Sequence, residues 1–143
     1  MGDSHDGGVW IEVLTSEECS SLLERSSVGR VGLNVDLLPV ILPINYAVDD
    51  KCIVFRSMVG TKLTAALDHT VVAFEVDDYE PSADLGWSVL IQGVASVVTD
   101  SEHIGKLSSL GLRHVSPGGL CDHFISLEMT KMTGRRIRPR YDT

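Results

Sequence analysis

The sequence predicts a mainly β domain whose strands are antiparallel. Its 143 residues, 43% of them hydrophobic, suffice for one domain with its own core. Short runs of β-forming residues recur along the chain, and the helix signal at 61–67 is too short for a parallel crossover. The runs cover residues 28–35, 39–48, 52–56, 71–76, 87–99, 124–129 and 132–138. This pattern favours a sandwich or a barrel.

The first element is a helix, predicted by the segment TSEECSSLLERS. Thr15 can accept a hydrogen bond at the helix N-terminus, and Glu18, three residues on, completes a capping box. One apolar face is formed by Leu14, Cys19, Leu22 and Leu23. We expect residues 1–12 to form a flexible segment, residues 13–138 the domain, and residues 139–143 a tail.

The middle of the chain predicts a hairpin and one long strand. The aspartates at 49–50 form a turn signal between the runs 39–48 and 52–56, so these two runs are expected to pair. The acidic stretch 77–86 is expected to be a loop. In the long run that follows it, Gly93 is a candidate bend or bulge.

Two short helices are expected between the strands. One covers residues 61–67. The other begins near Asp100, where Thr99 and Glu102 match a capping box, and it ends near Leu107. No internal repeat or low-complexity segment interrupts this order.

The charges are distributed unevenly along the chain. The sequence has 12 Lys and Arg against 20 Asp and Glu, a net charge of −8. Five of the basic side chains lie in residues 131–143. Proteins that mainly bind nucleic acid or acidic membranes carry basic patches, so we expect neither partner. No signal peptide, membrane-spanning run or metal-ligand spacing is visible, so we expect a cytoplasmic protein with reduced cysteines and no metal.

One segment, FRSMVGTKL, has the composition of an anion site. It leaves a strand, turns at a glycine and enters a helix, whose first N–H groups can bind a phosphate. Arg56 and Lys62 are its two cations, and Ser57 and Thr61 add hydroxyl donors. The segment matches neither a Walker A loop nor a GxGxxG fingerprint. A solvated strand–turn–helix therefore remains the alternative.

Six segments, taken in order, resemble one known family. They are VGRVGL, PVILPINYAVDD, IVFRSMVGTKLTAAL, VVAFEVDDYEP, GWSVLIQGVASVVTD and TGRRI, and they span roughly residues 13–138. In this order they resemble the flavin-nucleotide-binding proteins related to pyridoxamine 5′-phosphate oxidase. The resemblance implies a split β-barrel of about six antiparallel strands with a few short helices. It also implies a homodimer with FMN bound at its interface.

The resemblance further implies which residues contact the cofactor. The phosphate would be bound by Arg56, Ser57, Thr61 and Lys62. The ring system would be contacted by Pro43, Ile44, Asn45, Tyr46, Trp87 and Ser88, with Arg135 and Arg136 approaching the same cleft. Trp87 is equally compatible with a place in the core. The resemblance and the spacing leave the catalytic residues unassigned.

The function implied is that of an FMN-binding oxidoreductase, which passes hydride or electrons between cofactor and a small organic substrate. Full-length pyridoxamine 5′-phosphate oxidases carry more basic residues at the phosphate and a further substrate-binding segment, which argues against oxidation of the vitamin itself. One alternative is a deazaflavin coenzyme, as in a deazaflavin-dependent reductase. Others are a non-enzymatic carrier or sensor of flavin or deazaflavin nucleotides, and a cofactor-free dimeric scaffold.

Overall fold

A computed structural model describes residues 8–58, 62–112 and 122–140, and the fold is mainly β. Its elements, in chain order, are β1 (Val9–Val13), α1 (Ser16–Arg25), β2 (Val28–Val35), β3 (Leu38–Asn45), β4 (Ala47–Asp49), β5 (Cys52–Met58), α2 (Lys62–Leu67), β6 (Thr70–Glu80), η1 (Pro81–Ala83), β7 (Leu85–Val97), α3 (Ser101–Ser108), β8 (Asp122–Glu128) and β9 (Lys131–Pro139). None of the helices in these three ranges has the length and apolar character needed to cross a bilayer.

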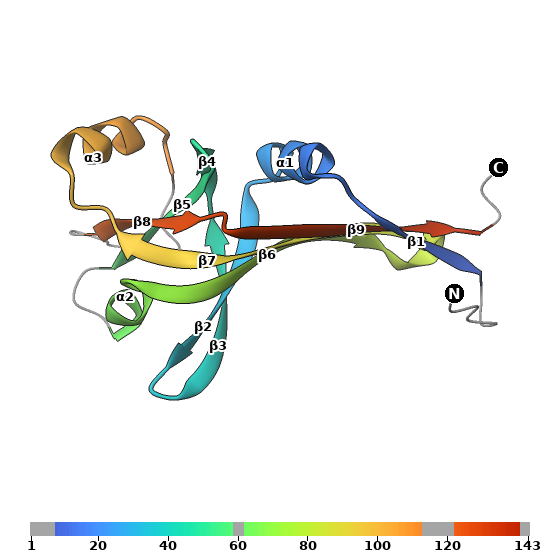
Figure 1. The fold of residues 1–143 in the computed structure, drawn as a ribbon, viewed down its shortest axis with the longest axis horizontal. Helices are drawn as coiled ribbons and strands as arrows, with labels where there is room; N and C mark the ends of the chain where they lie inside the picture. The colour runs from blue at the N-terminus through green and yellow to red at the C-terminus, as the bar shows by residue number, and fades with distance from the viewer. Residues whose placement is uncertain (1–7, 59–61, 113–121, 141–143) are drawn as a thin grey trace.

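The strands form one antiparallel sheet that curls into half of a barrel (Figure 1). The strand order is β3-β2-β6-β7-β8-β5-β4, and β9 pairs with both β7 and β1. The expectation of a mainly β, antiparallel split barrel is confirmed. Within the described residues the sheet has nine strands rather than about six. The seven runs predicted from the sequence become nine strands because β1 is added and the run 39–48 divides at Tyr46 into β3 and β4.

Strand β1 corrects the expectation of a flexible segment over residues 1–12. β1 pairs with β9 from Val9 opposite Pro139 to Val13 opposite Arg135. Its sequence, VWIEV, consists largely of β-branched and aromatic residues, which favour a strand once a partner is available. The prediction of a flexible segment is therefore wrong for residues 9–12. Residues 1–7 lie outside the described ranges.

Strand β6 corrects the expectation of a loop over residues 77–86. Residues 77–80 continue the strand and pair with residues 85–88 of β7, so only the short turn around η1 connects the two strands. Asp77, Asp78 and Glu80 are exposed. Because solvent reaches the strand here, polar side chains do not prevent it from pairing.

Strand β7 joins the two halves of the sheet. It pairs with β9 as far as Gln92 and with β8 from Ala95 onward. Gly93 lies at this change of partner, where a Cβ atom would collide with the backbone carbonyl of Glu128. The special position of Gly93 is thus explained by a close backbone approach, while the pairing of β7 with β6 continues without a bulge.

The two longer helices are capped by side chains. In α1 the expected capping box is present, with Thr15 and Glu18 each accepting from the backbone of the other. In α3 the cap is Asp100, whose Oδ2 accepts from the His103 backbone N–H at 3.0 Å. The expectation of Thr99 as the cap is therefore wrong by one residue.

The core lies on one face of the sheet, where α1 and α2 pack. Its fully buried side chains include Leu23, Leu67, Phe74 and Ile91. A smaller cluster holds α3 against β5 and β8. Since side chains alternate along a strand, the same strands also have a face directed away from the core, which we call the outer face. It carries the exposed apolar residues Val28, Ile41, Val71, Leu90, Ile11 and Val13.

Candidate functional site

The expected phosphate site lies where β5 ends and α2 begins. Arg56 and Ser57 are neighbours in β5, so their side chains point to opposite faces. Arg56 Nη1 donates to the carbonyl oxygen of Leu112 at 3.1 Å, and the guanidinium lies 5.1 Å from the ring centroid of Phe124. The hydroxyl of Ser57, a buried residue, lies 2.9 Å from that of Thr64 in α2. These two predicted donors therefore do not converge on one point.

Lys62 begins α2 and is the most accessible of the predicted phosphate donors. Its Nζ lies 3.0 Å from Oδ2 of Asp36, in the turn between β2 and β3, and its side chain is 81% exposed. Such exposed ion pairs contribute about 0–1 kcal/mol, so a more highly charged anion can replace Asp36 as the partner. Thr61, expected beside Lys62, lies outside the described residues.

Three of the expected ring-side residues lie at the end of β3. Pro43 and Asn45 belong to the outer face, because Pro43 is opposite Arg30 and Asn45 is opposite Val28. Ile44 points the other way and is buried in the core. The outer face therefore presents the Asn45 amide, whereas Ile44 can offer only its main chain.

The fourth expected ring-side residue, Tyr46, has its side chain in the core. Its hydroxyl donates to the carbonyl oxygen of Leu23 at 2.6 Å, and its ring meets Phe74 edge to face at 4.9 Å between centroids. Burial raises the pKa of the Tyr46 hydroxyl to about 12. The Tyr46 side chain thus holds α1 against the sheet, with its hydroxyl bonded to Leu23 and its ring packed in the core.

A cavity of about 330 Å³ lies near the start of β7. Four neighbouring strands form its wall, with Ile11 from β1, Asp77 and Tyr79 from β6, Trp87 and Ser88 from β7, and Arg135 and Ile137 from β9. The structure thus brings Ser88, predicted to contact the cofactor, together with Arg135. Trp87 is paired with Arg136, so its side chain lies on the opposite face, where it packs against the core. Aromatic, hydroxyl and charged groups all face one small space.

Arg136, the second arginine of the TGRRI segment, lies on the opposite face of β9 from Arg135. Its Nη1 donates to Glu18 Oε2 at 3.0 Å and lies 3.9 Å from Glu12 Oε2. The Thr15 backbone N–H and, after it, Arg136 lower the pKa of Glu18. Arg136 therefore ties α1 to β9, and Arg135 is the arginine that reaches the cavity.

The expected phosphate site and the cavity lie at opposite ends of β7. Figure 1 shows α2 and α3 at one end of this strand and β1 at the other. Arg56 is paired with Phe124, whose carbonyl accepts from the N–H of Val98 just beyond β7. Trp87 is eleven residues before Val98. At about 3.3 Å per residue a straight strand would cover about 36 Å, and the curl of the sheet shortens this somewhat. Within one chain Arg56 and Trp87 therefore lie far apart along the sheet.

Comparison with known proteins decides the family. A family model described as pyridoxamine 5′-phosphate oxidase matches residues 15–136. The chain belongs to the pyridoxamine 5′-phosphate oxidase family. The resemblance proposed from the six sequence segments is thereby confirmed.

Several relatives match this family member over most of their length. An FAD-binding protein from Mycobacterium smegmatis is 34% identical, with a TM-score of 0.74 over 88% of this chain and 97% of that one. A conserved protein of unknown function from Corynebacterium diphtheriae is 30% identical, with a TM-score of 0.73 over 87% and 96%. The uncharacterized protein Rv0080 of Mycobacterium tuberculosis is 32% identical over 129 residues, which are 87% of this chain and 84% of the relative.

This family member also has a charged cluster on its outer face that sequence reasoning missed. Arg30 Nη1 lies 3.1 Å from both Glu75 Oε1 and Asp77 Oδ2. Burial and the neighbouring Asp77 carboxyl raise the pKa of Glu75 to about 7, although Arg30 opposes them. The two-residue spacing of Glu75 and Asp77 indicates that both lie on one face of β6. The position of Arg30 beside them depends on how β2 pairs with β6, which the sequence does not show. Glu75 can therefore gain or lose a proton near neutral pH.

Proposed function

We propose that the chain is a flavin-nucleotide-binding oxidoreductase that acts as a homodimer. The observation that carries this proposal is the 34% identity, over 88% of the chain, to a structure named as an FAD-binding protein. FMN, which the sequence resemblance implies, and FAD share the isoalloxazine ring and the first phosphate. The proposal therefore covers both flavins at this point.

The donors near the end of β5 fit a phosphate. An acidic chain with a net charge of −8 needs local cations to hold such a group, and Arg56 and Lys62 supply them. Lys62 is exposed and can turn from Asp36 to a phosphate without disturbing the core. Arg56 is held by Leu112 and Phe124, so it contributes positive potential from a fixed position.

The separation along β7 supports the homodimer. The span from Arg56 to the cavity is longer than a flavin mononucleotide, so one flavin nucleotide contacts both ends of β7 only when two copies meet. The outer face is suited to be the dimer interface, because Ile41, Val71 and Leu90 are all exposed on it. Exposed apolar groups gathered on one face favour burial against a partner.

When bound, a flavin supplies the hydride or electron chemistry of the reaction. The chain's own part is to fix the ring and limit its contact with water. The Asn45 amide, on the outer face, is the side chain suited to hydrogen-bond the polar edge of the ring. Glu75 can hold a proton near neutral pH on the same outer face. We propose a small organic molecule as the substrate.

An absorbance spectrum and a titration test the binding step. The purified protein should be yellow, or it should quench the fluorescence of added FMN or FAD at micromolar concentrations. A deazaflavin coenzyme titrated in parallel tests the alternative cofactor. Failure to bind any of the three overturns the proposal.

Lys62→Ala tests the phosphate assignment. Loss of one charge-assisted hydrogen bond should raise the flavin dissociation constant about 10- to 100-fold. Lys106→Ala is the matched control, because Lys106 is another exposed lysine near an aspartate, with Nζ 3.8 Å from Asp49 Oδ1. Equal dissociation constants for both variants and the unchanged protein would contradict the assignment.

Turnover separates an enzyme from a carrier or sensor. Asn45, the side chain assigned to the ring, is neither an acid nor a base, which is the observation that favours a non-enzymatic carrier as the second candidate. Steady-state oxidation of the reduced flavin protein by a panel of small organic acceptors supports the enzyme. Tight binding without turnover by any acceptor supports the carrier.

A further inference from the structure

The cavity near the start of β7 has an ordered pattern of side chains. Asp77, Ser88 and Arg135 are direct cross-strand neighbours on β6, β7 and β9, so they form one polar row. The next row on the same face is Tyr79, Gly86, Ile137 and Ile11. A polar row and an apolar row thus lie side by side along the cavity.

Gly86 shapes the apolar row. A Cβ atom at this position would collide with the ring of Tyr79, so the glycine lets that ring lie against β7. Tyr79 is 51% exposed and so offers ring surface to a ligand. Aromatic surfaces of this kind stack on planar heteroaromatic rings.

The polar row has an acceptor at one end and a strong donor at the other. Adjacent strands are about 4.8 Å apart, so Asp77 and Arg135 are separated by about 10 Å across β7. Asp77 is held by Arg30 at 3.1 Å, and as a carboxylate it can accept from an amino group. Arg135 presents the planar guanidinium that suits phosphate oxygens.

The size of the cavity limits what it can hold. A volume of about 330 Å³ is at the lower end of the range for ligand sites, which is roughly 300–1,000 Å³. It suits one heteroaromatic ring with its sugar and is too small for a whole dinucleotide. The Asp77 carboxylate at one end of the cavity repels an anion. A negatively charged group of the ligand must therefore lie toward Arg135.

We propose that this cavity binds the adenosine part of FAD, and that it makes the chain selective for FAD over FMN. The Tyr79 ring packs against the purine, Asp77 accepts from the purine amino group, and Arg135 binds the diphosphate. This inference rests on the proposed flavin binding. In the homodimer the cavity of one copy serves the flavin whose first phosphate is held at Lys62 of the other.

Titrations with FAD, FMN and ADP test the inference. The unchanged protein should bind FAD at least about tenfold more tightly than FMN, because only FAD fills the cavity. ADP should displace FAD in competition. Arg135→Gln and, separately, Tyr79→Leu should weaken FAD about tenfold and leave the dissociation constant of FMN unchanged.

Arg138→Gln is the matched control, because Arg138 lies on the opposite face of β9 and pairs with Glu12 at 3.3 Å. It should leave the affinities of both flavins unchanged. Equal affinity of the unchanged protein for FAD and FMN, or equal weakening of both flavins in the two cavity variants, would overturn this inference while leaving flavin binding intact. Failure to bind either flavin would overturn the proposed function and this inference with it.

Discussion

The inner and outer faces of the sheet come from the same strands, yet they have different surroundings. On the inner face Phe74 and Ile91 are fully buried against α1 and α2. On the outer face, in the described part of the chain, Val71 is 71% exposed, and Arg30 and Glu75 form an ion pair farther along the same face. Because side chains alternate, neighbouring residues of one strand are separated into those that are buried in the core and those that are exposed for the contacts proposed above. A substitution can therefore change the core without changing these contacts, or the reverse.

The largest expected effect is on the inner face. Phe74→Ala should lower the free energy of unfolding by about 3–5 kcal/mol, because it removes a fully buried ring that packs against Tyr46. Urea unfolding followed by fluorescence measures this. Val71→Ala, on the outer face of the same strand, is the control and should change the free energy by less than about 0.5 kcal/mol. Similar losses for the two variants would remove the distinction between the faces.

The next effect should appear in self-association. Val71→Lys places a charge on the exposed apolar part of the outer face, where a homodimer would have to bury it. The dimer dissociation constant, measured by sedimentation equilibrium, should rise by about tenfold or more, with little change in monomer unfolding. Val71→Thr, which adds no charge, is the milder control. A dimer as tight in Val71→Lys as in the unchanged protein would place the interface elsewhere.

The smallest effect is a pH dependence of stability that comes from Glu75. Its pKa is raised from 4.5 to about 7 in the folded chain, so the folded state binds this proton more tightly. The resulting stability is complete below about pH 4.5 and is lost as pH rises through 7. Because the Glu75 side chain is 35% exposed, we expect a loss of only about 1–2 kcal/mol.

Glu75→Gln should remove that contribution. Urea unfolding at pH 5 and pH 8 should show a smaller decrease in stability for the variant than for the unchanged protein. Asp78→Asn is the control, since Asp78 is exposed and lies on the other face of β6. Identical pH dependence of Glu75→Gln and the unchanged protein would show that Glu75 does not carry the effect.

Local patterns in the sequence predicted local structure well. The capping box of α1, the bounds of β2 and the hairpin between β4 and β5 each depend on residues within a few positions of one another. The hairpin turn contains Asp50 and Lys51, both with positive φ, as a tight two-residue turn requires. Propensity and turn chemistry were sufficient at these points.

Properties that depend on strand register could not be predicted from the sequence. Whether Arg135 or Arg136 reaches the cavity is decided by which residue of β9 lies opposite Ser88 of β7. Likewise, Arg56 and Ser57 appear together in one motif, although strand alternation turns them to opposite faces. The sequence could name these residues as candidates, but only the pairing of distant strands shows which of them share a space.

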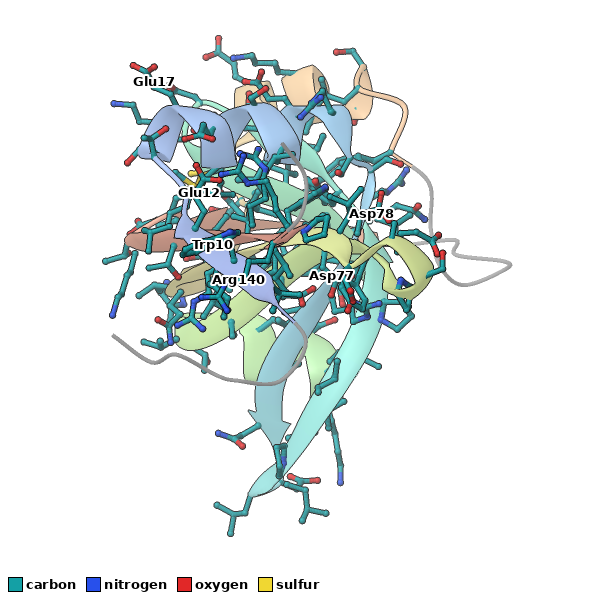
Figure 2. The ribbon with its side chains drawn as sticks, turned by 90° about the vertical axis from the view of Figure 1, so that its right-hand side faces the viewer. Trp10, Glu12, Glu17, Asp77, Asp78 and Arg140 are labelled. Carbon is teal, nitrogen blue, oxygen red and sulfur yellow. The ribbon has the colours of Figure 1, made fainter. Side chains whose placement is uncertain are left out.

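The pairing of β1 with β9 has a consequence for how the protein is made. Val9 and Pro139 are partners, and near them the Arg140 guanidinium lies 5.1 Å from the Trp10 ring centroid, as Figure 2 shows from that side. During synthesis β1 therefore leaves the ribosome long before its partner strand β9. Until β9 emerges, the apolar residues Trp10, Ile11 and Val13 have no native strand beside them. This edge of the sheet can be completed only after β9 has been translated.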